Sequence, residues 1–253
     1  NTWDLMKSSW AVLMRDPVLL LFPVVSGVAC FLVLLTFIVP ALGLGGGGMR
    51  SLAHGYGGIG GYLLLFCYYL CNFFVVFFFN AALVDFVNTR LQGGQPTLGG
   101  SLRAAAACLP QIAMWAVVAS TVGVVLKALE SRAGFLGRIV VALVGVAWTL
   151  VTYFVVPVIV IERKSALDAI GSSKDLLART WGKQIVSGLG YGLIGFLLTV
   201  PAIIVIGLAV VGLVASQGHH AGGWGSLAVA AVLYLVALGI VLSALRAIFG
   251  VVL

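Results

Sequence analysis

The stretch from Tyr62 to Val84 reads YLLLFCYYLCNFFVVFFFNAALV and contains no charged side chain. A helix needs about 20 predominantly apolar residues to cross a hydrocarbon core about 30 Å thick, and it satisfies its own backbone hydrogen bonds in doing so. A strand of a membrane barrel is excluded, because such strands alternate apolar and polar residues over about 10 positions. The stretch therefore predicts a membrane-spanning helix.

Five further apolar runs extend this pattern over the chain. Hydrophobic residues make up 62% of the sequence and charged residues 8%, whereas soluble domains carry roughly 25% charge. We therefore predict one all-α domain over residues 1–253, a polytopic transmembrane helical bundle. Its six spans are expected at residues 18–42, 61–87, 106–128, 136–161, 184–215 and 226–250.

The first span is not expected to be a cleavable signal peptide. Its apolar part is longer than the usual range of about 7 to 15 residues, and no A-x-A site precedes a soluble domain. We expect it to remain in the membrane. The chain begins at Asn1 rather than Met and stops at Leu253 inside an apolar run, which is compatible with further residues at both ends.

Lysine and arginine are unevenly divided between the two alternating sets of connectors, and in membrane proteins they accumulate on the cytoplasmic side. One set carries only Arg50, Lys127, Arg132 and Arg138. The other set includes both chain ends and carries Lys7, Arg15, Arg90, Arg103, Arg163, Lys164, Lys174, Arg179, Lys183 and Arg246. Both termini are therefore predicted in the cytoplasm, where most of the net charge of +7 would face anionic headgroups. Nucleic acid is not an expected partner, because the basic residues are few and scattered.

The connector from Glu162 to Lys183 reads ERKSALDAIGSSKDLLARTWGK and has the pattern of an amphipathic helix. The apolar residues that recur at helical spacing are Ala166, Ile170, Leu177 and Trp181, with Ser173 in the same stripe. We predict an interfacial helix over residues 165–181, lying in the cytoplasmic headgroup layer. Its candidate headgroup contacts are Arg163, Lys164, Lys174, Arg179, Trp181 and Lys183. Such a helix either docks lipid or a partner, or serves only to orient the chain.

Short internal echoes point to a repeated unit. The segment from Ser8 to Arg15 shares two serines, a leucine and an arginine with the segment from Ser172 to Arg179, and SALDAI at 165–170 resembles SALRAI at 243–248. Together with GSLR at 100–103, these echoes predict three hairpins, each made of an interfacial lead-in and two crossings. The matches are short, so shared interface chemistry explains them about as well as duplication does.

Three stretches carry a resemblance to known proteins. They are SSWAVLMRDPVLLLFPVVSGVACFLVLL at 8–35, FFVVFFFNAALVDFVNTRLQGGQPTLGGSLRAAAACLPQIAMWAVVAS at 73–120 and VVPVIVIERKSALDAIGSSKDLLARTWG at 155–182. Together they resemble an uncharacterised family of prokaryotic six-helix membrane proteins. More distantly, the span that ends in a proline and an acidic residue, followed by an Ala-Leu helix and a Trp, is similar to the membrane domain attached to some glycerophosphodiester phosphodiesterases. The resemblance implies a fold and a compartment, the prokaryotic inner (plasma) membrane, but no activity.

Polar residues inside the spans are candidates for function, because an ionisable or amide group in hydrocarbon is costly. Asp85 lies near the cytoplasmic end of the second span, where a structural ion pair or a headgroup-level carboxylate is favoured over a proton site. Asn72 and Asn80 lie deeper, and contacts between packed helices are favoured over a solute path. Pro201 removes the backbone donor to Leu197 inside the long fifth span, so a kink or a tilt is expected there.

No metal or other cofactor is expected. The cysteines form no C-x-x-C pair, so packing of reduced thiols is favoured over redox or metal chemistry; they are Cys30, Cys67, Cys71 and Cys108. The histidines lie on the predicted outer face without an accompanying carboxylate, which is too few ligands for a metal site; they are His54, His219 and His220.

An enzyme is not expected either. The sequence contains no H-E-x-x-H motif and no G-x-S-x-G motif, and seven acidic residues leave little general acid or base chemistry. Two functions remain open. The first is a structural or accessory component of a membrane assembly, with lipids and either its own copies or another membrane protein as partners. The second is a channel or transporter for a small solute or ion, using a crevice or an oligomeric pore near Asn72, Asn80 and Pro201. The scarcity of charge inside the spans favours the first, since ion-coupled carriers usually keep a buried ionisable residue.

Overall fold

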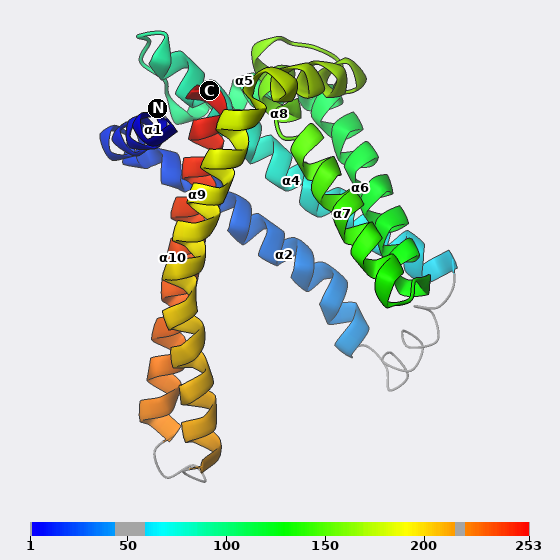
Figure 1. Cartoon of the computed structure of the whole chain (residues 1–253), viewed down its shortest axis with the longest axis vertical. Helices are drawn as coiled ribbons and strands as arrows, with labels where there is room; N and C mark the ends of the chain where they lie inside the picture. The colour runs from blue at the N-terminus through cyan, green and yellow to red at the C-terminus, as the bar shows by residue number, and fades with distance from the viewer. Residues whose placement is uncertain (1, 44–58, 216–220, 253) are drawn as a thin grey trace. The chain divides into compact units, whose positions relative to one another are not determined.

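The computed structural model describes residues 2–43, 59–215 and 221–252, and within these ranges the chain is helical and contains no strand. This confirms the predicted fold class. The elements are α1 (Thr2–Arg15), η1 (Pro17–Leu20), α2 (Leu21–Gly43), α4 (Ile59–Leu91), α5 (Leu98–Ala106), α6 (Leu109–Arg132), α7 (Phe135–Val151), α8 (Val155–Ile161), α9 (Ala166–Ala215) and α10 (Ala221–Val252), as shown in Figure 1.

Six helical segments among the described residues are long and apolar enough to cross a membrane. They are Pro17–Ile38, Gly60–Leu91, Leu109–Arg132, Phe135–Ile161, Gly195–Leu213 and Gly223–Val251. Each coincides with one of the six predicted spans. Two details differ from the prediction: the fourth span consists of two helices, α7 and α8, and the predicted interfacial helix is not separate from the fifth span. No proline lies between Ala166 and Pro201, so α9 continues from the connector into the membrane segment without a helix-breaking residue.

The chain divides into two compact units. The larger unit is Leu21–Thr180, and the smaller unit combines Asn1–Leu20 with Trp181–Leu253. Each unit is described by itself, and the prediction of a single domain stays a prediction.

Within the larger unit, α4 packs against α2, α5, α6 and α8. Rings join α2 to α4 at both ends of the pair: Phe22 meets Phe86 with ring centroids 6.0 Å apart, and Phe37 meets Tyr68 at 5.6 Å. Phe22 precedes Phe37 in α2, whereas their partners follow one another in the reverse order in α4. The two helices are therefore antiparallel. They form the first predicted hairpin.

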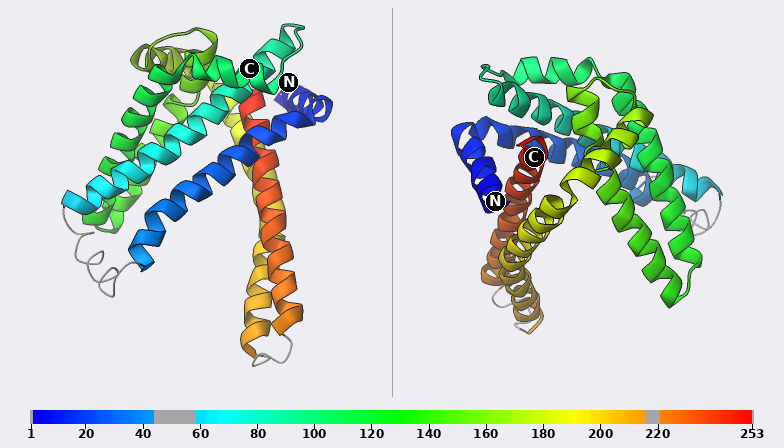
Figure 2. Two further views of the ribbon diagram at one scale, coloured as in Figure 1. Left: turned by 180° about the vertical axis from the view of Figure 1, so that it is seen from behind. Right: turned by 45° about the horizontal axis from the view of Figure 1, so that its top comes forward.

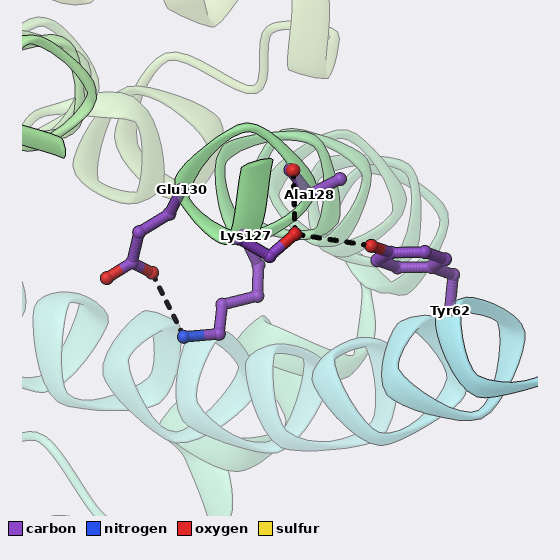
Figure 3. Close-up of polar contacts among 5 residues, drawn as sticks. Tyr62, Lys127, Ala128 and Glu130 are labelled. Atoms are coloured by element: carbon purple, nitrogen blue, oxygen red, sulfur yellow. Dashed lines mark hydrogen bonds and ion pairs between the residues drawn. The ribbon is translucent and has the colours of Figure 1, made fainter. Parts of the chain in front are cut away.

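Helices α4 and α6 are also antiparallel. The Phe77 and Trp115 rings lie 5.8 Å apart, and the hydroxyl groups of Tyr62 and Ser131 are 3.4 Å apart at the other end of the pair. Figure 3 shows this end, where Lys127 forms an ion pair with Glu130 at 3.0 Å. Both charged side chains are about half exposed, as expected for groups at the level of the headgroups. The last turn of α6 is thus tied to the first turn of α4.

The C-terminal end of α4 is closed by two glycines. Gly93 has a φ of +81°, and its N–H donates to the Arg90 carbonyl, while the Gly94 N–H donates to the Thr89 carbonyl. These two bonds form a Schellman motif, which needs a residue in the left-handed region at the first position after the helix. Thr97 then caps α5 by accepting a hydrogen bond from the Gly100 N–H at 3.1 Å. Helix α4 therefore reverses into α5 within a few residues.

In the smaller unit, α9 and α10 run side by side and antiparallel (Figures 1 and 2). A Cβ atom on Gly195 would lie 3.0 Å from Leu242, and one on Gly212 would overlap the Trp224 ring. Between these points the Tyr234 hydroxyl donates to the Leu198 carbonyl at 3.1 Å, three residues before Pro201. Helix α9 is unbroken at Pro201, and the predicted kink stays a prediction.

Three lead-in helices share a pattern of burial. Helix α1 packs against α10, α5 packs against α4, and the first turns of α9 pack on the joint between α7 and α8. Each carries one fully or almost fully buried serine, namely Ser9, Ser101 and Ser173. Each lead-in thus covers the end of another span, in line with the predicted division into three hairpins.

The close approach of α9 and α10 predicts different outcomes at two glycines of α9. Gly212→Ala should lower the free energy of unfolding by about 1 to 3 kcal/mol, because the new methyl group collides with Trp224. A Cβ atom on Gly207 would meet no neighbouring side chain within 4 Å, so Gly207→Ala should be neutral or stabilising by up to about 1 kcal/mol. SDS titration of the purified protein, followed by circular dichroism, measures both. Equal effects at the two positions would show that the helices do not approach closely at Gly212.

Candidate functional site: the joint in the fourth span

The fourth span is interrupted inside the predicted membrane segment. Helix α7 ends at Val151 and α8 begins at Val155, with three residues in a turn between them. Pro157 explains the position of this joint, because it has no N–H to donate to the carbonyl four residues earlier and its ring clashes with that carbonyl. The affected carbonyl belongs to Tyr153, in the middle of the turn.

At the joint, hydrogen bonds that span three residues replace the α-helical bonds that span four. Tyr153 N–H donates to the Leu150 carbonyl at 3.3 Å, and Val155 N–H donates to the Thr152 carbonyl at 3.2 Å, each over three residues instead of four. An uninterrupted helix would use Phe154 N–H on Leu150 and Val155 N–H on Val151. The joint therefore leaves the Phe154 N–H and the Val151 carbonyl without helical partners. Each unsatisfied backbone group costs several kcal/mol in hydrocarbon, by an order-of-magnitude estimate of about 2 to 7.

One side chain satisfies both groups. The Ser173 hydroxyl donates to the Val151 carbonyl at 2.5 Å and accepts from the Phe154 N–H at 3.1 Å. Ser173 has no exposed surface, and it comes from the first turns of α9, which lie across the ends of α7 and α8 (Figures 1 and 2). A hydroxyl group has one donor and can accept at the same time, which is what this pair of backbone groups requires.

A short turn brings α9 back over the joint. Ser165 caps the helix, since its hydroxyl accepts from the Asp168 N–H at 3.2 Å and donates to the Asp168 carboxylate at 2.6 Å. Lys164 adds a second tie, because its Nζ lies 2.6 Å from Glu162 Oε2 and donates to Ser172 Oγ at 2.9 Å. The register that places Ser173 on the joint is therefore fixed locally by the turn.

Arg163 connects this turn to the start of α6. It is the one residue other than glycine with a positive φ in the part of the chain that the structure describes, at +53°. Its Nη1 donates to Cys108 Sγ at 2.9 Å, and the Cys108 thiol lies 3.9 Å from the Ile159 carbonyl. A left-handed backbone costs a residue with a side chain about 1 to 2 kcal/mol. The contact with the buried Cys108 offsets this cost.

The residues predicted to contact headgroups are only partly brought together. Arg163 and Lys164 lie in the turn, and Lys174 and Arg179 are exposed on α9. The side chains of Trp181 and Lys183 lie outside those that the structure describes. The apolar stripe of this segment faces protein: Ala166 and Ser173 are buried, and Ile170 and Leu177 are half-buried. Headgroup contact stays a prediction for the exposed side chains.

The three intramembrane candidates have different surroundings. Asn72 Nδ2 donates to the Tyr68 carbonyl of its own helix at 3.0 Å. Asn80 is half-buried, and its amide has no hydrogen bond in the described part of the chain. Asp85 is half-buried next to a buried stretch of α4 and forms no ion pair within the described residues. Asp85 lies on the same face of α4 as Asn88 and Thr89, near the C-terminal end of the helix.

Among the described residues, no group of three or more His, Cys, Asp or Glu side chains could hold a metal ion. His54, His219 and His220 lie outside the residues that the structure describes. Of the cysteines, Cys67 and Cys71 are exposed on α4, Cys30 is half-buried on α2, and Cys108 is buried.

The sequence signal for the joint is present but incomplete. Helical spacing places Ser173 in the apolar stripe of the amphipathic segment, and Pro157 is visible inside the fourth span. The hydrogen bonds of Ser173 at the joint link residues 19 and 22 positions apart, which periodicity along one helix does not predict. A serine in an otherwise apolar stripe and a proline inside a span are the clues that the sequence offers.

The six apolar helical segments among the described residues, each long enough to cross a bilayer, are those of a multi-pass membrane protein of the helical type. Residues 59–253 match the model of a family of unknown function, DUF6159, and the chain belongs to this family. No curated protein and no solved structure matches the chain. None of these comparisons supports the more distant resemblance to the membrane domain of glycerophosphodiester phosphodiesterases.

The Arg163 contact predicts the accessibility of one thiol. In a variant whose other three cysteines are replaced by alanine, Cys108 should react slowly with N-ethylmaleimide, because only 1% of the residue is exposed. Arg163→Ala should make the reaction several-fold faster, because it removes the side chain whose Nη1 lies 2.9 Å from the sulfur and so opens access to the thiol. Lys164→Ala is the matched control, since Lys164 contacts Glu162 and Ser172 instead. Equal rates in all three proteins, measured by mass spectrometry, would contradict the contact.

Proposed function

We propose that this protein is a non-enzymatic structural or accessory component of a membrane assembly, located in the prokaryotic inner (plasma) membrane with both termini in the cytoplasm. One observation carries the proposal. Aromatic rings join the helices of the larger unit, with Trp115 buried and its ring partners half-buried, and most polar side chains in the spans bond to their own helix. These contacts suit helix packing better than the passage of a solute.

The rings form a continuous series across three helices. Tyr69 and Phe73 lie 5.7 Å apart on α4, Phe73 and Phe77 lie 5.7 Å apart, and Phe77 reaches Trp115 of α6 at 5.8 Å. Trp115 in turn stacks on Trp148 of α7 at 6.0 Å. Ring pairs at such distances add about 0.5 to 1.5 kcal/mol each beyond the area that they bury. The series holds α4, α6 and α7 together where a solute path would need polar groups or water.

Hydroxyl groups in the spans are satisfied locally. Ser120 and Thr121 of α6 donate to the carbonyls of Ala116 and Val117, and Thr149 of α7 donates to the carbonyl of Gly145. A hydroxyl bonded to the carbonyl one turn earlier on its own helix has its donor satisfied and needs no partner outside that helix for it. Together with Asn72, these groups support packing as the role of the spans.

Lipids and further membrane helices are the partners that the exposed surface supports. Helix α7 has no buried side chain, and Phe135 and Leu136 at its start are 80% and 76% exposed. Large apolar side chains exposed on this scale require a hydrocarbon environment or another helix. We propose membrane lipids and either copies of the same chain or another membrane protein as these partners, with no nucleic acid and no cofactor.

One observation favours the alternative of a channel or transporter. The Asn80 amide lies at membrane depth without a hydrogen bond in the described part of the chain. An amide in hydrocarbon gains from a partner, which a neighbouring subunit or a hydrated pore would supply. A pore formed between subunits does not need a charged residue inside each span.

Flux across liposomes separates the two functions. Purified protein reconstituted into liposomes should pass ions and small solutes no faster than empty liposomes do, at several membrane potentials, because the larger unit is packed by rings. The pore alternative is correct instead if flux appears and Asn80→Leu abolishes it. Asn72→Leu is the matched control on the same helix, since the Asn72 amide already bonds to Tyr68. It should leave any such flux unchanged.

Cysteine labelling tests the proposed orientation. In a background without native cysteines, Lys174→Cys should react with an impermeant maleimide only after the cells are permeabilised, because the α9 lead-in is proposed to face the cytoplasm. Arg132→Cys at the end of α6 should react on intact cells. Both positions are exposed, so access to the reagent depends on the side of the membrane. The opposite pattern would place both termini outside.

A further inference from the structure

We propose that the joint between α7 and α8 is a two-state element, and that docking of the α9 lead-in through Ser173 selects its broken form. The proposal does not depend on the function proposed above, since a packed scaffold and a pore would both contain the fourth span. It rests on the hydrogen bonds at the joint and on the position of Pro157.

In the broken form, the Phe154 N–H and the Val151 carbonyl both have hydrogen-bond partners. Tyr153 and Val155 donate over three residues, and the Ser173 hydroxyl bonds to the Phe154 N–H and the Val151 carbonyl. The two bonds from Ser173 are present only while the lead-in lies on the joint. The turn that holds the lead-in is fixed by its own bonds from Lys164 and Ser165, so the lead-in docks as a unit.

A second set of partners exists without Ser173. When the lead-in leaves, Phe154 N–H can donate to the Leu150 carbonyl and Val155 N–H to the Val151 carbonyl, which restores the α-helical pattern. Pro157 still withholds its bond from Tyr153, as it does in any kinked membrane helix. Both arrangements satisfy the Phe154 N–H and the Val151 carbonyl. The joint therefore has two folded forms, one broken and one continuous.

Thermodynamic linkage then requires a reciprocal effect. If the docked lead-in favours the broken span, a span forced into the continuous form must weaken the docking of the lead-in. The residue for this test is Pro157, which favours the break and has no hydrogen bond to Ser173. A purely local packing role of Ser173 predicts no such effect.

Two measurements on the full chain in lipid nanodiscs follow the form of the joint and the docking of the lead-in. Spin labels carried by unnatural amino acids at Leu143 of α7 and Ile161 of α8, which are both exposed, give the distance across the joint. Hydrogen exchange followed by mass spectrometry gives the protection of residues 166–179. Pro157→Ala should lengthen the distance and make exchange in the lead-in about tenfold faster, the size expected for loss of one or two hydrogen bonds. Ser173→Ala should do the same.

The controls lie next to these positions. Ser173→Thr keeps the hydroxyl and should behave as the unaltered protein. Lys174→Ala changes the neighbouring residue, which is exposed and has no bond to the joint, and it should leave both measurements unchanged. Unchanged lead-in exchange in Pro157→Ala would overturn the coupling, and an unchanged distance in Ser173→Ala would overturn the role of the hydroxyl. Pro157→Ala removes a helix breaker and should fold even if Ser173→Ala does not, so its result decides in that case.

Discussion

Every backbone N–H and C=O group inside a bilayer must find its partner within the protein, because hydrocarbon offers none. The other features of this chain depend on how it meets that requirement where its helices are interrupted. At the joint of the fourth span, the Ser173 hydroxyl replaces two missing backbone bonds. Near Pro201 in the smaller unit, the Tyr234 hydroxyl of α10 donates to the Leu198 carbonyl of α9. The second bond does not replace the one that Pro201 withholds, which would go to Leu197, and α9 is unbroken there.

This requirement gives the lead-in of α9 a structural role beyond orientation. Its apolar stripe lies on protein, with Ala166 and Ser173 buried, and its exposed side carries Lys174 and Arg179. Helices α1 and α5 repeat the arrangement, each with a buried serine, Ser9 or Ser101, and each packed against a span. The short sequence echoes therefore fall on positions that are buried alike. Duplication of a unit and shared interface chemistry both account for this likeness.

For function, the division of polar groups in the spans matters most. Most of them bond within their own helix, as Asn72 does, and aromatic rings fill the contacts between α4, α6 and α7. These features support a packed component of a membrane assembly. Among the described residues, Asn80 and the buried Oε1 of Gln111 are exceptions without a hydrogen-bond partner, and they give the pore alternative its physical basis. Membership of a family of unknown function does not decide between a packed component and a pore.

The sequence by itself determined the six spans, because about 20 consecutive apolar residues fit a bilayer whatever the rest of the chain does. It also identified the amphipathic stripe through Ala166, Ser173 and Leu177, since helical periodicity depends only on near neighbours. Only the tertiary structure decided that Ser173 bonds to the joint between α7 and α8 and that Arg163 reaches Cys108. Those outcomes depend on contacts between distant residues, where backbone groups left open at the joint beside Pro157 are satisfied by a serine from the next helix. Local pattern does not encode such a pairing.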